Sequence, residues 1–122
     1  MQPFEKAALA AKCIDDKKGK KLQVLQVGEL TSIADYFVIA SGTSSTQVKA
    51  IADEVIDKLK EAGEEPIHIE GFNSAMWILV DFADVVVHIF MEETRDFYGI
   101  ERLWADAKHI SIAELGIDTQ EE

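Results

Sequence analysis

Residues 36–41 (YFVIAS) restrict the possible fold of this chain more than any other segment. They carry no charge and are apolar at both sets of alternating positions, so a strand formed here has no face suited to water. We therefore expect this strand at the centre of a sheet. A small, polar turn at residues 42–47 follows, and after it one apolar helical stripe made by Val48, Ile51, Ala52, Val55, Leu59 and Ala62.

The order of the elements predicts a mixed α/β (α+β) domain. The helix after the turn is expected to end at Gly63, and Pro66 precedes a strand at residues 67–71. A strand, a helix and a strand of these lengths predict a right-handed parallel crossover. The prediction is a mixed sheet of about five strands with three helices. Its other elements are a helix whose stripe runs from Phe4 to Ile14, strands at 22–27, 75–80 and 85–91, and a helix at 94–107.

Charge limits the classes of partner. The chain has 122 residues, 23 acidic and 12 Lys or Arg side chains, and a net charge of −11. Between Glu61 and Glu101 ten acidic side chains accompany one basic side chain, Arg95. Phosphate contacts supply most of the affinity of nucleic-acid binders, so we do not expect DNA binding. An acidic surface favours a basic partner, and acidity that serves solubility alone is the alternative.

The chain length suits one domain. No run of 18 apolar residues and no signal-like start is present, so we expect a cytoplasmic protein without membrane contact. Its single cysteine, Cys13, rules out an internal disulfide framework. Cys13 lies among alanines on the first expected helix, where a free thiol behaves as a small buried hydrophobe.

The turn at residues 42–47 has two interpretations. Ser44 with Gln47 three residues later matches a capping box, but a helix start after a strand is also an anion site. The Gly-Lys-Ser/Thr of a phosphate-loop NTPase is absent. Nucleotidyltransferases hold their metals with carboxylates two residues apart on a strand, and the chain has no Asp-x-Asp or Glu-x-Glu. We predict a cap and no catalytic residues; a nucleotide-binding enzyme that uses Gly42–Ser45 is the alternative.

Other polar residues give weak signals for metal or cofactor sites. His68 and Glu70 would share one face of a strand, but no second pair is near them in sequence. His88 lies in an apolar strand, where a hydrogen-bonded sheet residue is expected. Asp81 and Asp84 flank a short hairpin connection, which is typical of turns. We therefore expect no metal and no cofactor.

Two segments are candidates for an interface. Trp77, Leu79 and Asp81 share one face of their strand, and three helices would not cover both faces of about five strands. Apolar surface left open there would suit a partner, and burial in the core is the alternative. Residues 95–104 (RDFYGIERLW) form the second segment, with a stripe of Phe97, Ile100, Leu103 and Trp104 expected on one side. Gly99 within this helix indicates close approach by another backbone, or a break.

Three segments together resemble the Iojap (RsfS) family of ribosomal silencing factors. They are residues 31–55 (TSIADYFVIASGTSSTQVKAIADEV), 70–90 (EGFNSAMWILVDFADVVVHIF) and 97–107 (FYGIERLWADA), and the resemblance spans about residues 4–108. Phe82-Ala83 replaces a more usual Tyr-Gly, and Gly99-Ile100 stands where an acidic residue and leucine are common. We therefore expect a family domain at residues 1–108 and a loosely attached acidic tail at 109–122.

The resemblance implies a nucleotidyltransferase-like fold without catalytic carboxylates and a non-enzymatic repressor of translation. Family members bind ribosomal protein fourteen of the large subunit and block joining of the small subunit, and organelle relatives assist large-subunit assembly. The resemblance also implies a basic ribosomal protein as partner, little direct rRNA contact and a homodimer in the free state. The contact residues implied are Trp77, Asp81, Phe82, Glu92, Arg95, Tyr98, Glu101 and Trp104. An acidic adaptor for some other basic protein is a further alternative.

Overall fold

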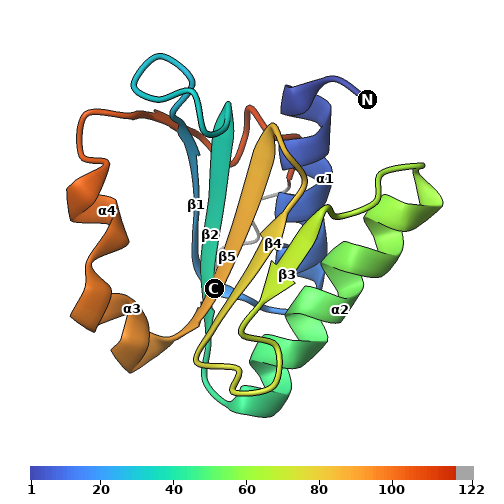
Figure 1. Ribbon diagram of the computed structural model, residues 1–122, viewed down its shortest axis with the longest axis vertical. Helices are drawn as coiled ribbons and strands as arrows, with labels where there is room; N and C mark the ends of the chain where they lie inside the picture. The colour runs from blue at the N-terminus through green and yellow to red at the C-terminus, as the bar shows by residue number, and fades with distance from the viewer. Residues whose placement is uncertain (118–122) are drawn as a thin grey trace.

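The computed structural model describes residues 1–117 and is drawn in Figure 1. Along the chain the elements are α1 (Pro3–Asp16), β1 (Lys20–Gln26), β2 (Tyr36–Gly42), α2 (Ser45–Glu61), β3 (His68–Glu70), β4 (Trp77–Asp81), β5 (Val85–Met91), α3 (Glu92–Tyr98), α4 (Ile100–Leu103) and β6 (Lys108–Ile110). In this part of the chain six strands form one sheet in the order β3-β4-β5-β2-β1-β6. The predicted α/β class with a mixed sheet is confirmed, with six strands instead of about five.

Strand β2 lies inside the sheet, as its apolar sequence predicts, and all seven of its residues are buried. It pairs in parallel with β5, whereas the other neighbouring strands pair antiparallel. Because β3 opposes β4 and β4 opposes β5, β3 runs in the same direction as β2. The crossover through α2 therefore joins parallel strands, as predicted, although β2 and β3 are not neighbours.

The helices cover the two faces of the sheet unequally. Helices α1 and α2 lie on one face and α3 and α4 on the other (Figure 1). The first face carries the larger apolar core, which includes Ile51 and Leu59. On the opposite face a smaller cluster surrounds Phe37 and Phe90, and Trp77 is only partly buried against it. No helix in residues 1–117 is long and apolar enough to cross a membrane.

The helix predicted at residues 94–107 is broken at Gly99. This residue has φ +58°, the left-handed conformation that glycine adopts without steric cost, and it separates α3 from α4. The break leaves Phe97 and Leu103 79% and 77% exposed. The predicted stripe is therefore wrong, since Ile100 alone is fully buried and Trp104 is half-buried.

The chain continues beyond the predicted domain boundary as part of the sheet. Strand β6 pairs with β1, and Ile110, Leu115 and Ile117 are buried in the larger core. The prediction of a loosely attached tail is therefore wrong for residues 109–117. Residues 118–122, the rest of that predicted tail, lie outside the described residues.

Candidate protein-binding surface

An apolar surface lies where β4 and α3 meet on the less covered face of the sheet. We call it the aromatic patch, and its members are Met76, Trp77, Leu79, Phe97 and Tyr98. Trp77 and Leu79 are half-buried on one face of β4, whereas Met76, Phe97 and Tyr98 are 57%, 79% and 51% exposed. A groove of about 510 Å³ runs along the patch, with Met76, Trp77, Phe97 and Tyr98 in its lining. Contiguous exposed apolar surface of this kind is a candidate binding site.

Trp77 is the anchored member of the aromatic patch. Its ring stacks on Phe90 at 4.8 Å between centroids and lies 5.0 Å from the ring of Tyr98. Its indole Nε1–H donates a hydrogen bond to Nδ1 of His88 at 3.2 Å. Burial lowers the pKa of His88 to about 4, so the imidazole is neutral at pH 7. The predicted hydrogen-bonded sheet histidine is confirmed, and Trp77 is partly packed and partly open.

Acidic side chains surround the aromatic patch. Glu93 and Asp96 are exposed on α3. Glu70 pairs with Leu79 across β3 and β4, which places it on the same face of the sheet as the patch. The one basic residue in this part of the sequence, Arg95, is buried. The acidic rim formed by Glu70, Glu93 and Asp96 complements a basic partner, and the exposed guanidinium of Arg102 lies against Gly99 at the end of α3.

Arg95 and Glu101 form a buried link between α3, α4 and the sheet. The guanidinium donates from Nε to Glu101 Oε2 at 2.7 Å and from Nη1 to Ser41 Oγ at 2.9 Å. Partial burial raises the pKa of Glu101, but the bonds from Arg95 outweigh this effect and the net pKa is lowered. Arg95 is only 4% exposed, which contradicts its prediction as a contact residue. Its role is to hold the two short helices against β2.

Two predicted contact residues, Asp81 and Phe82, lie next to each other where β4 leads into its connection to β5, and they differ in exposure. Phe82 is 3% exposed and packs into the larger core, so its side chain is not on the surface and the prediction is wrong. Asp81 is half-buried, and its Oδ1 accepts a hydrogen bond from the Ala83 amide at 2.8 Å. The expected turn chemistry of Asp81 is confirmed. Phe82 points inward because the strand alternation brings it to the face covered by α1 and α2.

The remaining predicted residues are spread around the less covered face. Glu92 is half-buried in the first turn of α3. Trp104 is half-buried and packs edge-on against Phe37 at 5.1 Å. Of the eight predicted contact residues, the structure brings Trp77 and Tyr98 together in the patch. Sequence reasoning missed Met76 and assigned Phe97 to a buried stripe, although a break at Gly99 removes the reason to bury it.

The turn at residues 42–47 caps α2. Ser44 Oγ accepts from the Gln47 amide at 3.1 Å, as the capping prediction requires. The side-chain oxygen Oε1 of Gln47 accepts from the Thr43 amide at 2.8 Å. The reciprocal bond of the predicted capping box therefore comes from Thr43 and not from Ser44. The Gln47 side chain also donates to the Lys18 carbonyl at 3.0 Å. Gln47 therefore ties the start of α2 to the end of α1.

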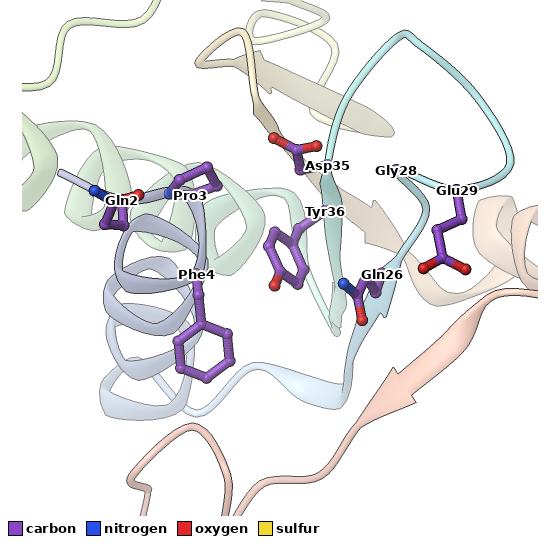
Figure 2. Close-up of a pocket in the computed structure, with 8 residues that line it drawn as sticks. All are labelled: Gln2, Pro3, Phe4, Gln26, Gly28, Glu29, Asp35 and Tyr36. Atoms are coloured by element: carbon purple, nitrogen blue, oxygen red, sulfur yellow. The ribbon is translucent and has the colours of Figure 1, made fainter.

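A second hollow, of about 410 Å³, lies between the start of α1 and the start of β2 (Figure 2). The rings of Phe4 and Tyr36 meet there at 6.0 Å between centroids. The carboxylates of Glu29 and Asp35 come from different segments and point in different directions (Figure 2). Among residues 1–117 no three His, Cys, Asp or Glu side chains are grouped so that they could hold a metal ion.

Comparison with known proteins gives consistent results. A sequence model of the family described as "Ribosomal silencing factor during starvation" (RsfS) matches residues 2–122. The chain is 43% identical over 99 residues to ribosomal silencing factor RsfS of Bacillus subtilis, covering 81% of this chain and 84% of that one. It is 34% identical over 91 residues to the mouse protein named mitochondrial assembly of ribosomal large subunit protein 1, covering 72% of this chain and 40% of that one.

A solved structure has the same fold. The crystal structure of a Chromobacterium violaceum protein superposes with a TM-score of 0.84 at 44% identity, covering 86% of this chain and 88% of that one. The agreement in sequence spans nearly the whole chain, and the agreement in structure spans most of it. The chain therefore belongs to the RsfS family of ribosomal silencing factors.

Proposed function

We propose that this protein silences ribosomes by binding and not by catalysis. It attaches to ribosomal protein fourteen of the large subunit, covers surface that the small subunit needs for joining, and so represses translation. A second role in large-subunit assembly is supported by the name of the mouse relative.

The aromatic patch and its acidic rim carry this proposal. Exposed aromatic side chains beside charged residues have the composition of binding hot spots, and a negative rim suits a basic ribosomal protein. Trp77 and Tyr98, with Met76 and Phe97, form the centre of the proposed interface. Its border adds Asp81, Glu92, Glu101 and Trp104 to the acidic rim residues Glu70, Glu93 and Asp96. Phe82 and Arg95 are buried and belong to neither the centre nor the border of this interface.

The net charge of −11 limits which ribosomal component makes the contact. Phosphate groups of rRNA would be repelled by most of the domain, so the ribosomal protein supplies the main contact. When the protein is free, it forms a homodimer with a second copy. Such a dimer would have to dissociate, or leave the patch open, before the protein binds the ribosome.

A nucleotide-binding enzyme at Gly42–Ser45 has less support. The amide of Thr43 already donates to the Gln47 side chain, and the amide of Gln47 already donates to Ser44. A phosphate would have to displace these oxygens in order to use the same donors. No observation among the described residues favours this alternative over capping.

The proposal is tested by mixing purified small and large subunits with the protein and following their joining by light scattering. Wild-type protein in excess should suppress joining, and Trp77→Ala should suppress it at least about 5-fold less effectively if Trp77 is a hot spot. Ser44→Ala is the matched control and should act like wild type once folded. Undiminished joining at saturating wild-type protein would refute the blocking function. Equal binding to unrelated basic proteins, lost at moderate salt, would indicate an adaptor.

A further inference from the structure

His88 is a polar residue buried directly beneath the aromatic patch. Its side chain is 4% exposed and shares the patch face of the sheet, because it pairs with Leu79 on β4 and Ile39 on β2. Phe37 lies on one side with its ring edge-on at 4.8 Å, and Trp77 lies on the other at 6.0 Å between centroids. The ring is therefore fixed between two aromatic side chains.

The bond to Trp77 determines which nitrogen of His88 carries the proton. An indole N–H can only donate, so Nδ1 of His88 accepts and the proton of the neutral ring lies on Nε2. Nε2 is buried and has no hydrogen-bond partner among the described residues. A buried donor without an acceptor costs stability. An aliphatic side chain at position 88 would avoid that cost but would leave the Trp77 indole N–H without its acceptor, so what histidine provides here is the bond to Trp77.

The hydrogen bond from Trp77 to His88 selects a single orientation of the indole, which stacking alone does not. The χ2 torsion of tryptophan is broad and roughly two-fold, so stacking on Phe90 at 4.8 Å tolerates a flipped ring as well as the observed one. The two orientations present different edges to the groove and to Tyr98. Only the observed orientation directs Nε1–H toward His88.

We infer that His88 is a positioning residue for the partner surface: through its Nδ1 it holds Trp77 in the orientation that a ribosomal partner recognises. This inference rests on the proposed function, because it specifies how the same surface is kept ready to bind. A fixed side chain loses less conformational freedom when a partner docks. Its test therefore needs one measurement of binding and one that does not involve the ribosome.

The variants His88→Leu and His88→Asn separate positioning from packing. Asparagine Oδ1 occupies nearly the place of histidine Nδ1 and keeps an acceptor, whereas leucine fills the site without one. We expect His88→Leu to bind purified large subunits about 5-fold or more weakly, the equivalent of one lost hydrogen bond, and His88→Asn to bind nearly like wild type. The midpoint of denaturant unfolding should change little in His88→Leu, because the unpaired Nε2–H of histidine is removed while the Trp77 indole N–H loses its acceptor. The Trp77 indole N–H resonance should shift in that variant and return toward its wild-type position in His88→Asn.

A double-variant cycle tests whether His88 acts through Trp77. Trp77→Phe keeps an aromatic ring but removes the donor, so adding His88→Leu to it should weaken binding no further. Wild-type affinity in His88→Leu, equal weakening in both His88 variants, or a full additional loss in the double variant would overturn the inference. If wild-type protein binds no large subunits, the proposed function fails. The positioning inference would then be decided by the indole resonance, and an unshifted signal in His88→Leu would refute it.

Discussion

At the scale of single residues, exposure separates the aromatic side chains that can meet a partner from those that support the fold. Tyr98 is half exposed and contacts both Trp77 and Phe97 in the patch. Phe82 is almost fully buried. Both residues belong to the sequence segments that resemble the family, so their resemblance alone does not distinguish a contact residue from a core residue.

Tyr98→Ala should weaken binding to large subunits by about 1–2 kcal/mol, because it removes an exposed aromatic contact. The free energy of unfolding should change much less, since the side chain is 51% exposed. Equilibrium binding and chemical denaturation measure the two quantities. Leu103→Ala is a matched control on α4, where the side chain is 77% exposed outside the patch. Equal weakening in both variants would mean that the patch is not the binding surface.

His88 should make stability depend on pH. Burial lowers its folded pKa from 6.5 to about 4, so between these values the unfolded chain binds the proton that the folded protein excludes. The free energy of unfolding therefore falls as the pH drops from about 6.5 toward 4. Between pH 7 and pH 5 the wild type should lose roughly 2 kcal/mol more than His88→Leu. Identical pH profiles would contradict the burial of a neutral imidazole. Hydrogen bonds from Lys6 and the N-terminal amine lower the pKa of Glu64, and the pKa of Glu101 is also lowered overall. Both carboxylates therefore affect stability below about pH 4.5, which lies outside the interval from pH 7 to pH 5.

At the scale of elements, local sequence predicted most helices and strands, and tertiary contacts decided the rest. Helix α2 was predictable because its apolar residues recur at helical spacing without interruption. Strand β2 was predictable because its apolar residues are continuous. Strand β6 was not, because its three residues form a strand only by pairing with β1. The break at Gly99 was one of two alternatives that the sequence left open. A prediction of the break would have left Phe97 exposed, and the predicted site would then have been closer to the aromatic patch.

Ser44→Ala should lower the free energy of unfolding by about 1 kcal/mol, because the Gln47 amide loses its acceptor. Binding to large subunits should be unchanged, since the cap lies outside the aromatic patch. Thermal or denaturant unfolding measures the first effect, and co-sedimentation measures the second. A specific loss of ribosome binding in a folded Ser44→Ala protein would favour the phosphate-loop alternative.

Ala83 occupies a backbone conformation that suits glycine. Its φ of +77° lies in the left-handed region, at a position where the family resemblance makes glycine more usual. Ala83→Gly should raise the free energy of unfolding by about 0.5–1 kcal/mol, because steric strain is relieved. The same change in the interior of α2, Ala50→Gly, should lower it by about 1 kcal/mol. If both variants are destabilised, the turn is not strained at Ala83.

At the scale of the whole molecule, the unequal cover of the sheet gives the protein its candidate binding surface. Composition predicted the acidic character, and the pattern of three expected helices against about five strands predicted the shortage of cover, so an open apolar face could be anticipated. The residues that line that face could not be predicted, because their exposure depends on where α3 and α4 pack against the sheet. Phe82 and Arg95 illustrate this limit, since each is polar or bulky enough to suggest contact yet lies buried.

The central claim is that this protein binds large ribosomal subunits through a surface made for one basic partner. Co-sedimentation with purified large subunits, small subunits and whole ribosomes at near-physiological salt tests it most directly. We expect binding to free large subunits and not to small subunits or joined ribosomes, with binding reduced in Tyr98→Ala and retained in Leu103→Ala. An absence of binding to every ribosomal particle would contradict it.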